Sequence, residues 1–194
     1  MNRPEQGNIL DGLEWLHDKA TQRDTVLIFL AGHGIQDKRG NYYFVPYNGN
    51  ANRLRRTAVR WSEFQELFIN IPSNVIMMTD TCQAGAVTGG NAKLIDLTET
   101  LREMKMAESN VIVMAASTAA QQSQERPEWG HGAFTKALLD GLGGLADANN
   151  DRTVDMKEID RYVARRVREL TNGEQTPTTV WISKTIPNFP LVVN

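Results

Sequence analysis

Three short apolar runs divide the chain and predict buried strands. They cover residues 25–31, 74–79 and 110–116, and each consists almost entirely of apolar side chains. Such a run, bounded by turn residues, is typical of a strand that is buried on both faces. Apolar positions at helical spacing surround these runs and predict helices near residues 8–20, 62–68, 94–106, 132–142 and 155–170.

Strands that alternate with helices predict an α/β layered fold, with a mostly parallel central sheet flanked by helices. Shorter strand-like pieces near residues 42–45, 178–183 and 190–193 complete the pattern, and residues 117–131 form a polar loop. A chain of 194 residues is long enough for one domain with a sizeable core. We therefore expect a single domain over residues 1–194.

Composition narrows the classes of function. The formal net charge of −2 gives no electrostatic reason to bind nucleic acid or a membrane surface. No apolar stretch approaches the ~20 residues that a membrane span needs, and residues 1–7 contain no signal-peptide core. The single cysteine excludes an internal disulfide framework and fits a reducing compartment. We expect a cytoplasmic protein.

The first two apolar runs each end at a reactive side chain. His33 follows the first run, between Gly32 and Gly34, and Cys82 follows the second. Open parallel sheets bind ligands at the carboxyl ends of their strands. A cysteine with an ordinary pKa is only about 3% thiolate at pH 7, so a nearby histidine that accepts its proton activates it. The pair predicts a Cys/His hydrolase, with the amides of Gly34 and Cys82 as candidate oxyanion donors.

Each of these residues also has a simpler interpretation. A lone cysteine is more often a small buried hydrophobe, and a histidine between glycines is more often a turn residue. His131 competes for the role of base, because Gly132 follows it, but its place in a polar loop before a helix favours a turn. The joint occurrence of His33 and Cys82 at two strand ends favours the catalytic interpretation.

Asp80 is a candidate substrate-binding residue. Residues two apart on a strand point to the same side, about 6.6 Å apart at Cα, so Asp80 and Cys82 are expected to share one cleft. A carboxylate opposes a neighbouring thiolate unless it receives a cation. We therefore expect Asp80 to bind an Arg or Lys side chain before the scissile bond. The alternative is that Asp80 caps a turn.

The segments LIFLAGHG and IMMTDTCQAG resemble those of caspase-like peptidases, specifically the bacterial metacaspase (orthocaspase) branch. Residues 9–16, 115–119 and 131–139 support the resemblance, which runs over most of the chain. It implies a caspase-like fold and a cysteine endopeptidase that cleaves proteins after Arg or Lys. It also implies His33 and Cys82 as the catalytic dyad, and a division into a large-subunit-like part (about 1–88) and a small-subunit-like part (about 107–194).

The chain departs from the family pattern in two places. Gln83 and Ala84 stand where relatives often carry His-Ser. The family also begins with a strand and helices ahead of the segment at 8–20, and this chain has only a few residues there. A missing strand leaves a neighbouring strand edge open. The chain is then a fragment, a trimmed chain, or a subunit completed by a partner chain or an N-terminal segment.

A twelve-residue stretch fits the spacing of a calcium-binding EF-hand loop. Its oxygen ligands come from Asp147, Asn149, Asp151, Thr153 (carbonyl), Asp155 and Glu158. Arg152 occupies the sixth position, which normally holds glycine, and must adopt an unusual backbone conformation. The alternative is a polar loop that caps the following helix. The peptidase chemistry itself requires no cofactor, so calcium is a candidate ligand rather than a requirement.

Relatives often cleave themselves between the two parts, and the candidate sites here are Lys93, Arg102 and Lys105, with a second basic cluster at Arg53, Arg55 and Arg56. Solvated surface charge is the simpler interpretation of these residues. The main alternative to a self-processing peptidase is a catalytically silent caspase-like module that binds or regulates a partner.

Overall fold

The computed structural model describes residues 3–83, 110–116, 124–181 and 188–193. In its N-terminal part the elements are α1 (Gln6–Lys19), β1 (Thr25–Gln36), β2 (Tyr42–Val45), η1 (Ala51–Arg53), α2 (Leu54–Thr57), β3 (Val59–Arg60), α3 (Trp61–Asn70) and β4 (Asn74–Gln83). They continue with β5 (Val111–Ala115), η4 (Pro127–Trp129), α5 (Ala133–Asp140), a π turn η5 (Gly141–Leu145), β6 (Thr153–Asp155), α6 (Met156–Leu170), β7 (Thr178–Trp181) and β8 (Pro190–Val193). The predicted helix at 94–106 lies outside the described residues.

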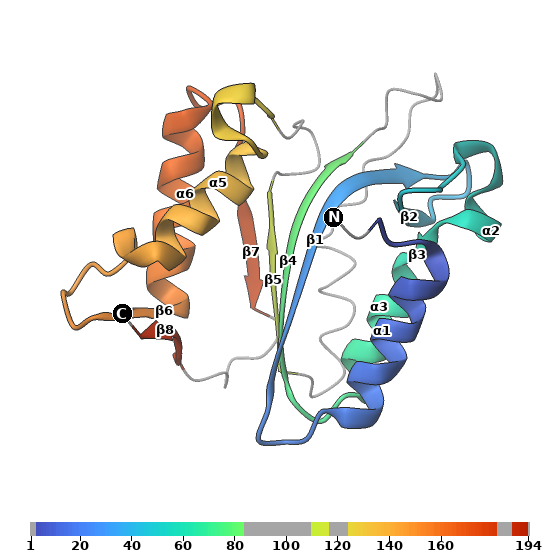
Figure 1. The fold of residues 1–194 in the computed structure, drawn as a ribbon, viewed down its shortest axis with the longest axis horizontal. Helices are drawn as coiled ribbons and strands as arrows, with labels where there is room; N and C mark the ends of the chain where they lie inside the picture. Colours follow the sequence, from blue (N-terminus) through green and yellow to red (C-terminus); the bar gives the residue numbers. More distant parts are fainter. Residues whose placement is uncertain (1–2, 84–109, 117–123, 182–187, 194) are drawn as a thin grey trace.

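The described strands form a six-stranded sheet in the order β3-β2-β1-β4-β5-β7. Its centre is parallel, because β1, β4 and β5 run in the same direction, and its margins are antiparallel. Helices α1 and α3 lie on one side of this sheet, and α5 and α6 lie on the other (Figure 1). The α/β layered architecture expected from the sequence is confirmed, with a mixed sheet. The two strand-like pieces predicted near residues 178–183 and 190–193 join different sheets. Strand β7 pairs with β5 in the six-stranded sheet, and β8 pairs with β6 in a separate two-stranded sheet.

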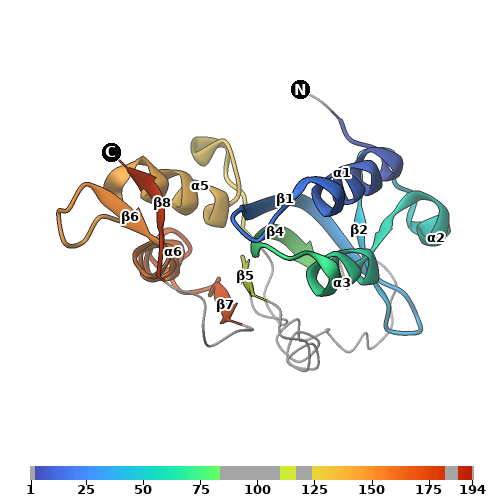
Figure 2. The same cartoon turned by 90° about the horizontal axis from the view of Figure 1, so that it is seen from below.

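Alternate residues of the central strands build two separate cores. Val75, Met77 and Val113 are buried on the face covered by α1 and α3. Ile76, Met78 and Ile112 are buried on the face covered by α5 and α6. Figure 2 shows these two helical layers from below, on either side of β4 and β5. Both faces of β4 are therefore buried, as its continuous apolar run predicts, and each such side chain contributes about 1.5–3 kcal/mol.

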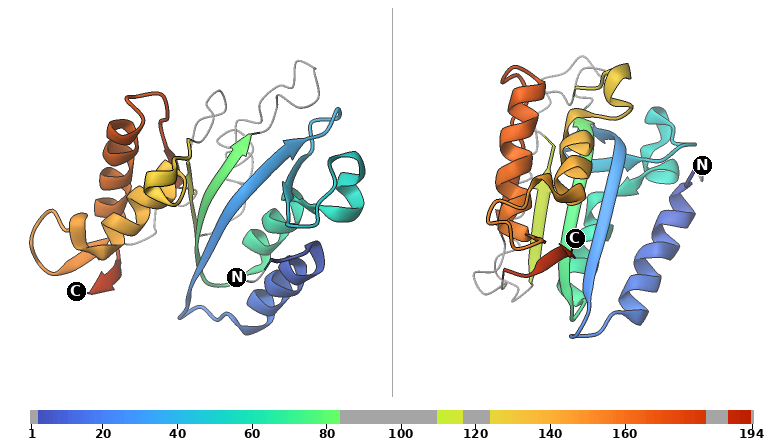
Figure 3. Two further views of the ribbon diagram at one scale, coloured as in Figure 1. Left: turned by 45° about the horizontal axis from the view of Figure 1, so that its top comes forward. Right: turned by 60° about the vertical axis from the view of Figure 1, so that its left-hand side comes forward.

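Strand β1 differs from this expectation, because only one of its faces is buried. Val26 and Ile28 pack against α1 and α3, whereas Leu27 is 52% exposed and Phe29 is 40% exposed. The reason is that α5 and α6 cover β4, β5 and β7 but stop short of β1 (Figure 3). The prediction that the first apolar run is buried on both faces is wrong for this strand.

The outer edge of β1 is also incompletely paired. Strand β2 pairs with β1 only along 33–36, where His33 lies opposite Val45 and Gln36 opposite Tyr42. Among the described strands, none pairs with this edge over residues 25–32. A strand edge of this kind presents backbone N–H and C=O groups to which a further strand can pair.

The C-terminal helix α6 is strongly amphipathic. Ile159 and Val163 are fully buried against α5. The Asp155 carboxylate caps the start of the helix by accepting hydrogen bonds from the N–H groups of Lys157 and Glu158, both at 2.8 Å.

None of the described helices combines the length and the apolar character that crossing a membrane requires.

Candidate functional site

His33 and Cys82 occupy paired positions on two adjacent parallel strands. In the register of β1 with β4, His33 is the Cα partner of Cys82, and both lie near the carboxyl ends of their strands. Neighbouring strands are about 4.8 Å apart, so the backbones of the two residues are close. The His33 side chain is exposed to solvent. The topology thus brings together the two residues that the sequence singled out as a dyad.

The two glycines that flank His33 are required by the local backbone and packing. Gly32 has a φ of +153°, which L-residues with a side chain rarely adopt. Gly34 is buried and is paired with Phe44 on one side and Gln83 on the other. A Cβ atom on Gly34 would lie 1.8 Å from the hydroxyl oxygen of Tyr42. The oxyanion role of Gly34 stays a prediction beside this packing role.

Asp80 lies two residues before Cys82 on β4, and its side chain caps the N-terminus of α5. Its side chain is buried, with only 8% of the residue exposed. The Thr135 N–H donates to Asp80 Oδ2 at 3.1 Å, and the Thr135 hydroxyl donates to the same oxygen. A helix N-terminus stabilises a carboxylate through these N–H groups and its partial positive charge. A Cβ on Gly132 would lie 2.5 Å from Asp80 Oδ2, so the close approach also requires glycine there.

Asp80 also lines a cavity of about 770 Å³ at the carboxyl end of the sheet. Phe29, Ala31 and Gly32 of β1 form one wall, and Thr135 of α5 lies beside Asp80. The segment before α5 forms the opposite wall, with Glu125, Arg126, Pro127, Gly130, His131 and Gly132. The cavity therefore contains two carboxylates and one guanidinium group, and it is large enough for an amino-acid side chain.

The two histidines near this cavity are placed differently. His131 lines the cavity, directly before the Gly132 that begins α5, and its side chain is exposed. His33 is not among the lining residues, but Gly32, which precedes it, is. The sequence interpretation of His131 as a turn residue fits its position between Gly130, with a φ of +69°, and Gly132. Its place on the cavity wall could not be read from the sequence.

The predicted calcium loop follows η5, at the end of α5 away from Asp80 (Figure 1). Arg152 has a φ of +67°, the conformation expected at the sixth position. The Asp147 carboxylate accepts hydrogen bonds from the N–H groups of Asp151 and Arg152, at 3.2 and 3.0 Å. The described residues contain no group of three or more His, Cys, Asp or Glu side chains placed to hold a metal ion. The calcium set therefore stays a prediction.

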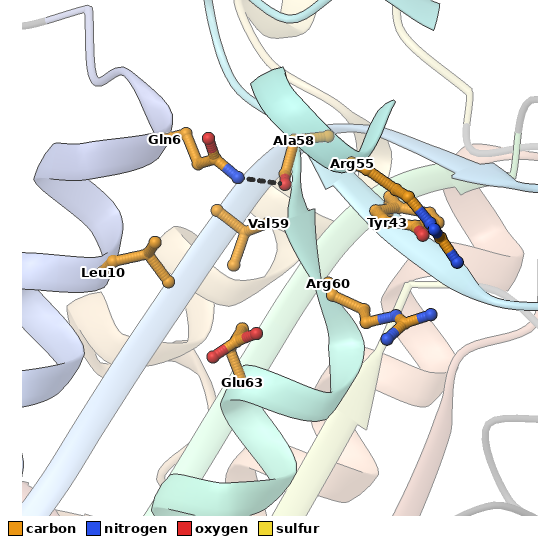
Figure 4. Close-up of a pocket in the computed structure, with 8 residues that line it drawn as sticks. All are labelled: Gln6, Leu10, Tyr43, Arg55, Ala58, Val59, Arg60 and Glu63. Atoms are coloured by element: carbon orange, nitrogen blue, oxygen red, sulfur yellow. Dashed lines mark hydrogen bonds between the residues drawn. The ribbon is translucent and has the colours of Figure 1, made fainter. Parts of the chain in front are cut away.

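A second pocket, of about 370 Å³, lies between α1 and the β2–β3 region (Figure 4). Gln6 joins the two sides by donating to the Ala58 carbonyl at 2.7 Å, above the apolar side chains of Leu10 and Val59. Arg60 stacks near the ring of Tyr43, 5.9 Å from its centroid. Its lining residues include neither cysteine nor histidine, so the pocket is not a second candidate for the predicted chemistry.

The candidate processing residues Lys93, Arg102 and Lys105 lie outside the described residues.

Comparison with known proteins defines the class of the chain. The α/β architecture is that of the crystal structure of protein GSU0716 from Geobacter sulfurreducens, a structural genomics target, with a TM-score of 0.61. The sequences are 14% identical, and the match covers 90% of this chain and 72% of the other. No curated protein matches the sequence significantly. The family model of the caspase domain (Peptidase C14) matches residues 1–186. The chain belongs to the caspase-domain family.

Sequence reasoning missed two contributors to the site. Thr135 had no signal beyond its place near the start of a helix, and its contact with Asp80 joins residues 55 positions apart. The sequence pattern places Tyr42 only in a short strand, and it does not indicate that the Tyr42 hydroxyl lies against Gly34. Both contacts depend on tertiary packing, so no local pattern in the sequence indicates them.

Proposed function

We propose that the protein is a cysteine endopeptidase in which Cys82 is the nucleophile and His33 the general base. The observation that carries the proposal is the pairing of these two residues at the carboxyl ends of adjacent parallel strands, in a chain of the caspase-domain family. His33 accepts the thiol proton, and the Cys82 thiolate attacks the scissile carbonyl. His33 then donates the proton to the leaving amine, and water hydrolyses the acyl-enzyme. The Gly34 and Cys82 amides stabilise the oxyanion.

We further propose that Asp80 selects an Arg or Lys side chain before the scissile bond. Its carboxylate lines the cavity beside β1, and its position on β4 is two residues before Cys82. Glu125 adds a second negative charge to the cavity wall and Arg126 adds one positive charge, so the acidic residues outnumber the basic one. A basic side chain in this cavity neutralises the charge that would otherwise oppose thiolate formation.

The dyad is tested with the variants Cys82→Ala and His33→Gln. Both are assayed on a peptide library in which the residue before the scissile bond is varied through all amino acids. Each substitution is expected to lower kcat/KM about a thousandfold or more, because it removes a group that acts in the transition state. His131→Gln tests the competing histidine, which lines the cavity, and His17→Gln is the control, because His17 is exposed on α1 and does not line the cavity. Loss of activity in His131→Gln, with His33→Gln still active, would reassign the base. A wild-type Cys82 that does not react with an arginine-directed probe would favour the binding-module alternative.

The specificity assignment needs Asp80→Asn rather than Asp80→Ala. An alanine leaves the Thr135 N–H and hydroxyl without their buried acceptor and destabilises α5, whereas asparagine keeps an acceptor oxygen. We expect Asp80→Asn to lower kcat/KM for an Arg peptide about 10- to 100-fold and to leave cleavage of a citrulline peptide nearly unchanged. Asp11→Asn is the control, because Asp11 is an exposed carboxylate on α1 and does not line the cavity. Equal Arg preference in Asp80→Asn and wild type would refute the assignment.

Self-processing remains part of the proposal. Incubation of the active protein beside Cys82→Ala, followed by mass spectrometry of the fragments, tests cleavage after Lys93, Arg102 or Lys105. Identical fragments from the two proteins would exclude it.

A further inference from the structure

The side chain of Tyr42 crosses one whole strand of the sheet. Tyr42 lies in β2, and its hydroxyl is 3.0 Å from the Oγ1 atom of Thr81, which lies in β4. Because β1 lies between β2 and β4, the ring must pass over β1 to make this contact. It passes over Gly34, where a Cβ atom would lie 1.8 Å from the hydroxyl oxygen and 2.4 Å from Cζ. Only glycine at this position permits the crossing.

The ring is held at both ends. Trp61 packs edge-on against it, with ring centroids 6.3 Å apart and an interplanar angle of 83°. At the other end, the Thr81 hydroxyl is 3.2 Å from the hydroxyl of Thr79. We name the contact between the Tyr42 and Thr81 hydroxyls the Tyr42–Thr81 bridge. Residues alternate along a strand, so Thr79 and Thr81 lie on the face of β4 opposite to Asp80.

The end of β4 that carries Cys82 has little other support from the described sheet. Strand β5 pairs with β4 only as far as Thr79, which lies opposite Ala115. Beyond that residue, β1 is the one described strand paired with β4, through Asp80 to Gln83. The Tyr42–Thr81 bridge spans this part of the sheet and ties β2 directly to β4.

We propose that Tyr42 is a positioning residue for the dyad, acting through Thr81. This inference rests on the proposed peptidase function. The bridge fixes the separation and twist of β1 and β4 at the level of His33 and Cys82, from the face of the sheet opposite to the cavity. A displacement of about 1 Å at a catalytic group costs on the order of a hundredfold in rate. Loss of the bridge therefore lowers kcat while substrate binding, which depends on the cavity, changes little.

The test combines Tyr42→Phe, Thr81→Val and the double variant. Phenylalanine keeps the ring and its contact with Trp61 and removes only the hydroxyl. We expect each single variant to lower kcat about tenfold or more with KM nearly unchanged, and the double variant to be no worse than either. Thr81→Ser keeps the hydroxyl and is expected to behave as wild type. Tyr43→Phe is the matched control, because Tyr43 adjoins Tyr42 on the strand and its hydroxyl contacts Asp37 instead, at 3.5 Å.

Two further readouts separate positioning from general stability. The rate of Cys82 alkylation by iodoacetamide, measured against pH, is expected to shift to higher pH in Tyr42→Phe because His33 no longer meets the thiol correctly. Amide hydrogen exchange of residues 79–83 is expected to accelerate in the same variant. Thermal unfolding monitors the fold. Additive effects in the double variant, or wild-type kcat and alkylation in Tyr42→Phe, would overturn the inference.

The outcome for the wild-type protein distinguishes the two proposals. An active wild type with an equally active Tyr42→Phe variant refutes positioning and leaves the peptidase function intact. A wild type that cleaves no peptide refutes the proposed function and with it the catalytic role of the bridge. Hydrogen exchange then still decides whether the bridge holds the end of β4.

Discussion

The two faces of the sheet are covered to different extents, and the difference lies in β1. On the face under α1 and α3, the buried side chains continue from β5 through β4 to β1. On the face under α5 and α6, they end at β4. Leu27 and Phe29 of β1 are exposed on this face, and Phe29 lines the cavity. The covered face supplies stability, and the uncovered part leaves room for the cavity that contains Asp80. An incomplete core at one strand is therefore compatible with a site at its end.

The largest expected effect concerns the covered part of the second face. Phe134 of α5 is completely buried between the sheet and α6. Phe134→Ala is expected to lower the free energy of unfolding by about 3–5 kcal/mol, because it removes buried surface and leaves a cavity. Urea denaturation measures the change. Leu139→Ala, on the same helix but 51% exposed, is the control and should change stability by about 0.5 kcal/mol or less. Similar losses in both variants would contradict the burial difference.

Adjacent residues of β1 test the contrast between its faces directly. Ile28→Ala is expected to lower the free energy of unfolding by about 2–4 kcal/mol, because Ile28 packs in the core under α1 and α3. Leu27→Ala, one residue away and half-exposed, should lower it by less than about 1 kcal/mol. Denaturation midpoints of the two variants give the comparison. A loss for Leu27→Ala as large as for Ile28→Ala would show that this face is covered in the native protein.

The junction between Asp80 and α5 is expected to have a moderate effect. Thr135→Val removes the hydroxyl that donates to Asp80 and keeps the backbone N–H donor. We expect a loss of about 1.5–3 kcal/mol, the usual contribution of a hydrogen bond to a carboxylate. Thermal unfolding measures it. Thr178→Val, on an edge strand, is a matched substitution elsewhere in the sheet. An equal loss in this variant would contradict a specific contribution from the contact between Thr135 and Asp80.

The smallest effect concerns the turn after β1. Burial raises the pKa of Asp37, but hydrogen bonds from Asn41, Arg39 and Tyr43 outweigh it and hold the pKa below its usual range. A carboxylate with a lowered pKa stabilises the fold above the unfolded-state value near 3.9, and this contribution is lost as pH falls through the folded-state value. Asp37→Ala is expected to cost about 1 kcal/mol at pH 7.

The pH dependence provides the check. The difference in unfolding free energy between wild type and Asp37→Ala should shrink as the pH falls below about 4. The exposed Asp11 serves as the control through Asp11→Ala. A difference that stays constant between pH 7 and pH 3 would show that the turn is stabilised by packing rather than by the ionised carboxylate.

Much of the architecture was predictable from local patterns. The helix at 155–170 corresponds to α6, and the three apolar runs correspond to β1, β4 and β5. These predictions hold because apolar periodicity is set by the geometry of each element and by the need to bury one or both faces. The pairing of the strand that ends at His33 with the strand that ends at Cys82 also agrees with the order expected for neighbouring parallel strands.

The sequence by itself determined the three central strands, the helix that corresponds to α6, and the family motifs around His33 and Cys82, all of which follow from short-range spacing. Tertiary structure decided what covers each face. It decided that β1 is buried on one side only, that Asp80 caps α5, and that Tyr42 reaches Thr81 across Gly34. These contacts join segments up to 55 residues apart. They depend on how layers pack and where they end, and no local pattern encodes that.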